Sequence, residues 1–521
     1  MSTQNYRILH SDIRLNEEYV EVPRDDFRSA CISIFQKHNA FLRLMFCTDE
    51  RAYTGCFRIY AVFSDSSSDR FIIINSAVAE ELSYPSITQD IPAAHWYERE
   101  IKDMFGLEPE GHPMPQRLVF HESFPQDSYP LRKDWSISET DLREWSEGIK
   151  VKEPYRFMRV EGEGIFEIPV GPVHAGIIEP GHFRFSAIGE TIFYLDSRFF
   201  YTHKGTEKQF EKIGFEKGAF LSERVSGTSS FSHSSAYCMA VERMCGIVLP
   251  QRAAAIRTLL LELERLYNNI GDIGNMCAGT GLSVGYAKGA LIKERLMQLN
   301  ERVTGSRYLR GINTLGGVAL DIMQKSDDIR STIGIVAKEY RDFVDLLLQT
   351  LSHIERMETT GHVAKEIARA LGITGLAARA SGIDDDMRKL HPHLLYGSLN
   401  FESHVLERGD DFARMLARVA DADSSIQLIK ELLEGQFSNE LASEYPVVPA
   451  MQHALGYVES SRGSLFYWVK SDPEGRVFRV KLRSPSYCNW SAMPFAVNGD
   501  IVPDFPLTNK SFNLSYSGCD M

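Results

Sequence analysis

Residues 250–274 read PQRAAAIRTLLLELERLYNNIGDIG. Apolar residues recur in this stretch every three or four positions, which is the spacing of one face of an α-helix. They are Ile256, Leu259, Leu260, Leu263, Leu266, Tyr267 and Ile270. Charged residues interrupt the run, so it does not read as a membrane span. The stretch predicts a long helix packed into a protein core, with Pro250 at the first helical position.

The sequence around this helix predicts a mainly helical domain. Residues 328–357 carry a second long helical pattern, and residues 409–435 predict a third helix followed by a fourth. Alternating apolar residues over 158–200 predict strands, and the tail returns to strands from residue 463. We therefore expect residues 158–521 to form a mainly α-helical domain with small β elements near both of its ends.

The first part of the chain differs in pattern. FRSACISIFQ (27–36) is helix-like, whereas FRIYAVFS (57–64) and DRFIIINSAV (69–78) are rich in the β-branched and aromatic residues of strands. A proline-bounded loop and a short amphipathic helix follow. Residues 1–135 therefore predict an α+β domain, and the polar residues 136–157 predict a linker. The fold class expected for the whole chain is α+β.

Composition limits the classes of function. A chain of 521 residues exceeds what one hydrophobic core usually serves, so we expect at least two domains. The net charge of −13 argues against non-specific nucleic-acid binding. The first residues show no signal-peptide pattern and no segment reads as a membrane span. We expect a cytoplasmic protein that, if it works at a membrane, does so through partners.

The cysteines do not predict a cluster or metal site. The eight cysteines are scattered and none form a C-x-x-C pair, so the chain offers no iron–sulfur motif and no cysteine-based zinc motif. No G-x-G-x-x-G follows a predicted strand, which argues against NAD binding. We expect reduced, mostly buried thiols and no cofactor bound by this chain.

Residues 95–120, HWYEREIKDMFGLEPEGHPMPQRLVF, and residues 129–135, YPLRKDW, carry a long and specific motif. This motif resembles the signature of the 30-kDa subunit of respiratory complex I, E-R-E-x-x-D-M-F-G followed by G-H-P and P-L-R-K-D. The resemblance implies that the predicted domain 1–135 is of that type. It also implies that this domain docks a partner subunit.

The remainder of the chain carries a second resemblance. GPVHAGIIEPGHFRFSAIGE (171–190), AYCMAVERMCGIVLP (236–250) and GITGLAARASGIDDDMRKLHP (372–392) are among its motifs. They resemble the large subunit of group 4, energy-converting nickel–iron hydrogenases, which is homologous to the 49-kDa subunit of complex I. In complexes of the formate hydrogenlyase and hydrogenase-4 type, the two modules are fused in this order.

The resemblance places the four metal-ligand positions on residues that are not ligands of nickel or iron. The family holds nickel and iron with four thiolates, from an early C-G-x-C and a late D-P-C-x-x-C motif. The early positions fall on Ser226 and Ser229 and the late ones on Ser515 and Gly518, with Cys519 one residue off. A hydroxyl stays protonated at neutral pH and is a poor ligand for a soft metal. We therefore expect no metal site.

The complex I form of the same cavity reduces quinone, and the resemblance to it is incomplete. That subunit has an Asp-Tyr pair at the first cysteine position, and the Tyr helps to hold the quinone headgroup. The pair falls here on Ser226 and Gly227, so the Tyr is absent. His174 and His182 of the predicted hairpin are retained. A quinone is therefore one expected ligand of this cavity, although one expected contact with it is absent.

A polar shell around the lost motif remains. The resemblance implies that Glu179 passes protons, as a carboxylate in a partly buried turn can; alternatively it caps the turn or pairs with an arginine. His174, His182 and His233 are expected around one cavity, although each alone could be structural. Further family positions are Arg379 and Asp385, expected in a buried ion-pair network, and Arg462, expected over the metal position or else on the surface.

Three interpretations follow from these residues. The first is a large subunit of a hydrogenase-related, complex I-like membrane assembly without a nickel–iron centre, which couples a quinone or similar acceptor to proton movement. Its expected partners are a small iron–sulfur subunit that carries the cluster and membrane subunits that include antiporter-like proteins. The second is a non-catalytic scaffold or coupling subunit of such an assembly. The third, which the ligand positions favour least, is an active hydrogenase.

Overall fold

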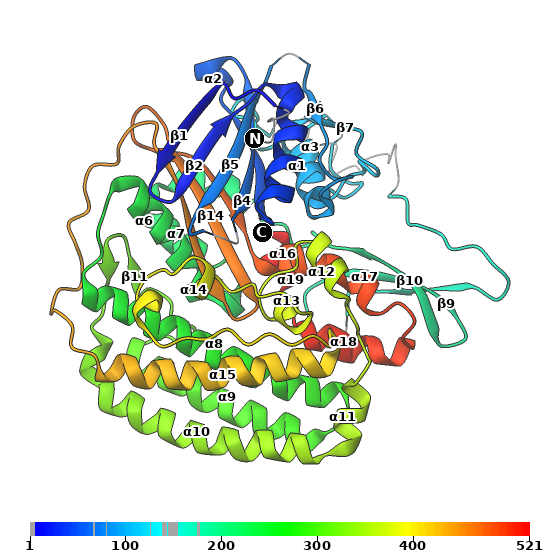
Figure 1. Cartoon of the computed structure of the whole chain (residues 1–521), viewed down its shortest axis with the longest axis vertical. Helices are drawn as coiled ribbons and strands as arrows, with labels where there is room; N and C mark the ends of the chain where they lie inside the picture. Colours follow the sequence, from blue (N-terminus) through cyan, green and yellow to red (C-terminus); the bar gives the residue numbers. More distant parts are fainter. Residues whose placement is uncertain are drawn as a thin grey trace.

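The structure is a computed structural model that describes residues 6–65, 68–79, 81–125, 127–137, 143, 155–174 and 178–521. Most of the linker expected over 136–157 lies outside these residues. Helices and strands are both abundant, as the expected α+β class requires (Figure 1). Among the described residues, we find no helix with the length and apolar character of a membrane span.

The N-terminal part is built on a five-stranded sheet with strand order β1-β2-β5-β4-β3. The strands are β1 (His10–Arg14), β2 (Glu17–Glu21), β3 (Phe41–Asp49), β4 (Phe57–Ser64) and β5 (Phe71–Val78). Helices α1 (Phe27–Lys37) and α3 (His95–Phe105) contact it. Every residue of β3 is buried, because neighbouring elements cover both of its faces.

A three-stranded sheet follows, with strand order β10-β9-β8. Its strands are β8 (Phe166–Val170), β9 (His182–Ile188) and β10 (Thr191–Arg198). The β9–β10 hairpin extends away from the body of the molecule (Figure 1). These strands confirm the β pattern predicted over 158–200.

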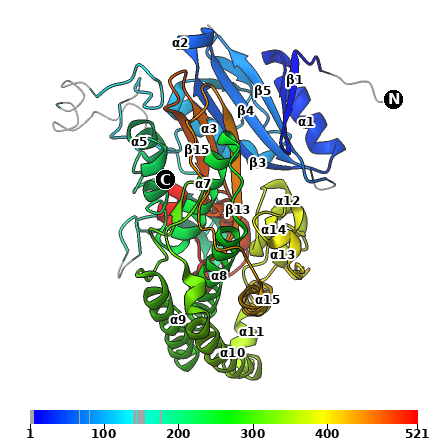
Figure 2. The ribbon, with the colours of Figure 1, turned by 90° about the vertical axis from the view of Figure 1, so that its left-hand side faces the viewer.

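Long helices form the far end of the molecule, opposite the N-terminal sheet (Figures 1 and 2). They are α8 (Gln251–Gly279), α9 (Ser283–Thr304), α10 (Ser326–Gln349) and α15 (Asp411–Glu434). Helix α8 packs against both α9 and α15. Its apolar stripe is buried, as predicted, but Pro250 is the extended N-cap residue and not the first helical one.

Two details of the predicted helices are wrong. The helix expected over 328–357 is interrupted at Thr350, after which α11 (Leu351–Met357) begins. The two helices expected over 409–435 are a single helix, α15. Its polar middle does not break the helix, because Asp421 and Ser425 point into buried polar contacts with Arg379 and Glu262.

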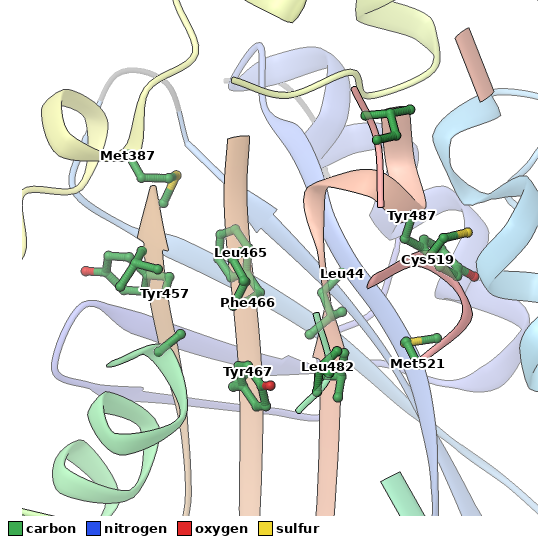
Figure 3. Packing of buried hydrophobic residues seen from close by; sticks show 14 of the residues in the cluster. Leu44, Met387, Tyr457, Leu465, Phe466, Tyr467, Leu482, Tyr487, Cys519 and Met521 are labelled. Atoms are coloured by element: carbon green, nitrogen blue, oxygen red, sulfur yellow. The ribbon is translucent and has the colours of Figure 1, made fainter. Parts of the chain in front are cut away.

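The C-terminal part begins with an antiparallel sheet of β13 (His453–Ser460), β14 (Gly463–Ser471) and β15 (Val477–Arg483). Strand β13 precedes the predicted start of this region. The sheet contacts α7 (Ser230–Cys245) as well as β3 of the N-terminal sheet. Figure 3 shows Leu44 of β3 in one cluster with Leu465 and Leu482 of the C-terminal strands. Apolar burial therefore joins the two ends of the chain.

Short elements complete the fold. They are α2 (Arg51–Thr54), β6 (Ser83–Pro85), β7 (Glu108–Glu110), α5 (Thr206–Ile213), α6 (Phe215–Ser222), β11 (Asn313–Thr314), β12 (Gly317–Val318), α12 (Lys365–Ala370), α13 (Leu376–Ala380), α14 (Met387–Leu390), α16 (Pro485–Asn489), α17 (Met493–Ala496), α18 (Phe505–Phe512) and α19 (Tyr516–Asp520). Helices α16 and α19 pack against each other near residues 226–229.

Candidate functional site

Ser226 and Ser515 each stand immediately before a short helix. Ser226 precedes the 3₁₀ turn Gly227–Ser229, and Ser515 is the N-cap of α19. The Ser515 hydroxyl accepts a hydrogen bond from the backbone N–H of Gly518 at 2.9 Å. This is the usual satisfaction of a free N–H at a helix start. Local structure thus fixes both late positions, 515 and 518, relative to each other.

The four positions converge on one small cavity. Ser226, Ser229, Ser515 and Gly518 all line a cavity of about 10 Å³, called here the hydroxyl cavity. The hydroxyl oxygens of Ser226 and Ser515 lie 2.9 Å apart. A volume of this size admits roughly one water molecule. The other residues that line it are Thr228, Ser460, Arg462, Ser484, Pro485 and Ser486.

Arg462 is buried at this cavity and is not a surface residue. It is 5% exposed. Its guanidinium donates to the backbone carbonyl of Asn513 and lies 3.2 Å from the carboxylate of Asp272 on α8. These contacts hold the side chain in place, because the guanidinium offers several donors in one plane. The position expected over the site is therefore occupied by a fixed positive charge.

The donor set does not fit a nickel–iron pair. The positions of the four thiolates present three hydroxyls and one glycine, which has no side chain. A Cβ built on Gly518 would lie 3.1 Å from Cβ and Oγ of Ser515. Cys519 is buried, and burial raises the pKa of its thiol well above the usual value, which opposes the thiolate form that metals need. Among the described residues, no three His, Cys, Asp or Glu side chains form a metal-binding group.

Two of the three histidines lie in the β8–β9 region. His174 Nε2 is 2.7 Å from the carbonyl oxygen of Gly181, to which it donates. His182, at the start of β9, is 7% exposed, and its Nδ1 lies 3.4 Å from the carbonyl oxygen of Gly171. Burial lowers the pKa of His182. Its Nε2 has no hydrogen-bond partner in the part of the chain that the structure describes.

His233 lies elsewhere, on α7. Its side chain is completely buried and its Nδ1 is 2.8 Å from the hydroxyl of Tyr467 on β14. Burial lowers its pKa to about 3, so the ring is neutral. None of the three histidines is among the described residues that line the hydroxyl cavity. The expected gathering of three histidines around this cavity is therefore not found.

Glu179 is exposed in this chain, which corrects the expectation of a partly buried turn. Its Oε2 accepts a hydrogen bond of 2.7 Å from the backbone N–H of Ser517 in the first turn of α19. A carboxylate at this place is favourable, because the first N–H groups of a helix lack partners within it. Glu179 thus connects the segment before β9 to the helix that carries Gly518.

A buried ion-pair network lies beside α8, as expected for Arg379. Arg379 pairs with Asp386 at 2.8 Å and with Asp421 at 2.6 Å. Its members are the arginines Arg265, Arg379 and Arg388 and the carboxylates Glu262, Asp386, Asp421 and Glu459. Asp385 pairs instead with Arg43 of β3, at 2.6 Å, so its carboxylate joins the two parts of the chain.

Several of these residues were not singled out from the sequence. Glu459 opens ESSRG, and Ser484 and Ser486 stand in RSPSY, where each is an ordinary polar residue. Burial, followed by the charge of Asp386, raises the pKa of Glu459 to about 8. Arg43 is one of two charged residues in the apolar strand FLRLMFCTD. The charge of Arg43 inside this apolar run was the one available signal, because a buried charge requires a partner.

Known proteins match almost the whole chain. Residues 20–141 match the family described as "Respiratory-chain NADH dehydrogenase, 30 Kd subunit", and residues 281–448 and 438–521 match its 49 Kd counterpart. Formate hydrogenlyase subunit 5 of Escherichia coli is 34% identical over 94% of this chain and 86% of its own length. Hydrogenase-4 component G of the same organism is 34% identical over 94% of this chain and 85% of its own length.

A solved structure is also similar. A chain from the membrane-bound sulfane sulfur reductase, described as an archaeal respiratory membrane complex, has a TM-score of 0.64 and 27% identity. The match covers 69% of this chain and 99% of that one. The chain belongs to the family of complex I-like oxidoreductase subunits in which a 30-kDa-type and a 49-kDa-type subunit are joined, together with formate hydrogenlyase subunit 5 and hydrogenase-4 component G.

Proposed function

We propose that this chain is the large subunit of a membrane-associated, complex I-like oxidoreductase that holds no nickel–iron centre. The observation that carries the proposal is the hydroxyl cavity. The four positions that hold thiolates in hydrogenases meet here as three hydroxyls and a glycine around about 10 Å³. Neither the donor chemistry nor the space suits two metal ions.

The electrons of the proposed reaction come from a partner. The described residues contain no metal-binding group of histidine, cysteine or carboxylate side chains, so a small iron–sulfur subunit would have to carry the cluster. Membrane subunits, among them antiporter-like proteins, would complete the assembly and hold it on the inner face of the membrane. The respiratory membrane complex that contains the similar solved chain supports this arrangement. A quinone or a similar molecule is the proposed electron acceptor.

Proton movement is assigned to Glu179, which precedes β9, and to His182, the first residue of β9. Glu179 is exposed, and its carboxylate accepts a hydrogen bond from the first turn of α19, which also carries Gly518. His182 has one ring nitrogen without a partner among the described residues. An exposed carboxylate and a histidine with a free nitrogen can take up and release protons.

Metal analysis of the purified complex tests the absence of the centre. We expect iron in the amounts that clusters of the partner subunits require and nickel far below one atom per chain. The chain isolated from its partners should contain neither metal. Stoichiometric nickel that stays bound through gel filtration would overturn the proposal and restore the hydrogenase interpretation.

Quinone reduction by the intact complex tests the reaction. Glu179→Gln and His182→Ala should each lower the rate strongly, while the assembled complex is recovered in normal amount. Glu190→Gln, in the β9–β10 turn, is the matched control because Glu190 is also an exposed glutamate. The control should keep the full rate.

A second function is favoured by the same cavity. A space of about 10 Å³ excludes a quinone headgroup as well as a metal pair. The first function therefore requires that a partner subunit completes the acceptor site, and without such a site the chain would act as a non-catalytic scaffold that couples its partners. Full quinone reduction in both Glu179→Gln and His182→Ala would support this second function. Loss of activity with intact assembly would exclude it.

A further inference from the structure

A second, much larger cavity lies between the N-terminal and C-terminal parts of the chain. Residues of α3, β10, α16 and α17 line it, and its volume is about 500 Å³. It shares no lining residue with the hydroxyl cavity among those described. This volume falls in the range of small-molecule sites, which often form at domain interfaces. We call it the aromatic cavity.

Aromatic rings dominate its walls. Eight Phe, Tyr and Trp side chains line it: Trp96, Tyr97, Tyr155, Phe193, Tyr194, Tyr487, Trp490 and Phe495. Phe193 and Phe495 remain 48% and 47% exposed. Large apolar rings usually lose more of their surface than this, and an aromatic ligand would cover them. The walls therefore favour a flat, apolar molecule.

The tautomer of His95 can be derived from its neighbour. Arg99 Nη1 lies 3.2 Å from His95 Nε2. A guanidinium can only donate, so Nε2 accepts and the ring proton resides on Nδ1. Burial lowers the pKa of His95 to about 3, which keeps the ring neutral. In the described part of the chain, His95 Nδ1 has no hydrogen-bond partner, so the cavity wall presents an unused donor.

Asp196 of β10 supplies an acceptor. Its Oδ2 accepts a hydrogen bond of 3.0 Å from the backbone N–H of Met158, and Oδ1 has no partner among the described residues. Burial raises the pKa of this carboxyl group. The Coulombic attraction of Arg99 opposes that shift. One negative and one positive group thus face the same space. A charged ligand would be attracted by one of them and repelled by the other, so the pair favours a neutral ligand.

Arg99 itself is not free to bind a ligand anion. Its Nε donates to the carbonyl of Gln116, and its Nη2 donates to the carbonyl of Arg117, both at 2.8 Å. With Nη1 directed at His95, three of its five N–H groups are engaged and its plane is fixed. Its role is therefore to orient His95 and to balance the charge of Asp196.

We propose that the aromatic cavity binds a neutral, planar aromatic molecule that carries a hydroxyl group. The ring lies between the aromatic side chains. The hydroxyl donates to Asp196 Oδ1 and accepts from His95 Nδ1–H, the two atoms that have no partner among the described residues. The site is separate from the hydroxyl cavity, so its ligand does not depend on the reaction proposed above.

Calorimetric titration with 2-naphthol tests this inference on the full-length chain. We expect saturable binding of one molecule per chain. Asp196→Asn and His95→Phe should each weaken binding about tenfold, since one good hydrogen bond in a buried site contributes about 1.4 kcal/mol. Trp96→Ala should weaken it by a similar factor. Asp345→Asn, an exposed aspartate on α10, is the matched control and should bind 2-naphthol as the parent does.

Two further probes separate ring chemistry from hydroxyl chemistry. 2-Methoxynaphthalene keeps the ring but cannot donate, and naphthalene-2-sulfonate carries a charge. Both should bind at least tenfold more weakly than 2-naphthol. Absence of saturable 2-naphthol binding, or equal binding by the parent and Asp196→Asn, would overturn the proposal.

A thiol reporter checks the location without any substitution. Cys488 lines the aromatic cavity, and it and Cys245 are the two cysteines that are partly exposed. Saturating 2-naphthol at about ten times Kd should slow the reaction of Cys488 with N-ethylmaleimide about tenfold. Cys245, at the end of α7, should react at an unchanged rate. Equal protection of both thiols, or of neither, would place the ligand elsewhere.

Discussion

The hydroxyl oxygens of Ser226 and Ser515 lie 2.9 Å apart, although 289 positions separate the two residues in the chain. They come from the turn before α7 and from the N-cap of α19. Each of the two hydroxyls also has a local partner, Thr228 in one case and the Gly518 N–H in the other. The early and late segments thus close on each other through neutral hydrogen bonds.

This closeness predicts a cross-link. In the double variant Ser226→Cys/Ser515→Cys, mild oxidation with diamide should join the two new thiols, because side chains in contact meet the distance that a disulfide needs. The eight native cysteines are free. Thiol titration of the denatured, oxidised variant should therefore find only these eight, and two more after reduction. Each single variant should keep its added thiol free. Two persistent free thiols in the double variant would contradict the contact.

The space around Gly518 predicts a cost for any side chain there. A Cβ would lie 3.1 Å from Cβ and Oγ of Ser515 and 3.4 Å from Oγ of Ser484. Hydrogen bonds to Ser226 and to the Gly518 N–H hold the Ser515 side chain in place, so it cannot give way. Gly518→Ala should therefore lower the free energy of unfolding by about 1–2 kcal/mol, as overpacking does. Urea unfolding measures this difference.

Gly227 provides the control for this substitution. It lies in the turn next to Ser226, and nothing stands within 4 Å of a Cβ built on it. Gly227→Ala should change the free energy of unfolding by less than about 0.5 kcal/mol. Equal effects of the two substitutions would show that the hydroxyl cavity is more open than described.

Glu459 predicts a pH dependence of stability. Its pKa in the folded chain is raised from 4.5 to about 8, first by burial and then by Asp386. The folded protein therefore keeps a proton that the unfolded chain loses, and this contribution to stability falls as pH rises from about 4.5 through about 8. Glu459→Gln stays neutral and escapes this loss. Its urea midpoint should exceed that of the parent more at about pH 8 than at about pH 5.

The matched substitution for this test is Glu440→Gln. Glu440 is exposed, so its replacement should leave the difference between the two pH values unchanged. The buried position matters because solvent screens the interactions of an exposed carboxylate. A parallel pH profile for the parent and Glu459→Gln would mean that Glu459 is ionised in the folded protein.

The pair Arg43–Asp385 predicts strong coupling between the two parts of the chain. Their side chains are 3% and 0% exposed, and their charged atoms lie 2.6 Å apart. Asp385→Ala should cost about 3–5 kcal/mol, because it leaves a buried arginine without its partner. Arg43→Met/Asp385→Ala should cost less than the sum of the single substitutions. The exposed pair Arg330–Asp327 should show a coupling below about 0.5 kcal/mol.

Local patterns in the sequence were sufficient for most elements. The apolar stripe of α8 and the β-branched runs of β4 and β5 predicted elements that the structure contains. The helical pattern predicted the wrong helix boundaries where polar residues contact a buried partner. Residues 409–435 were expected to form two helices, yet they form the single helix α15, inside which Asp421 and Ser425 meet Arg379 and Glu262. A single sequence does not show which distant charge will meet a polar residue.

The sequence alone determined that the thiolate positions carry Ser226, Ser229, Ser515 and Gly518, and hence that soft-metal ligands are missing there. Only the tertiary structure decided that these residues close around a water-sized space, that Asp385 pairs with Arg43, and that His233 is buried apart from them. Residue identity fixes which ligand chemistry is available. Distances between segments far apart in the chain follow from packing of the whole core, which no local pattern encodes.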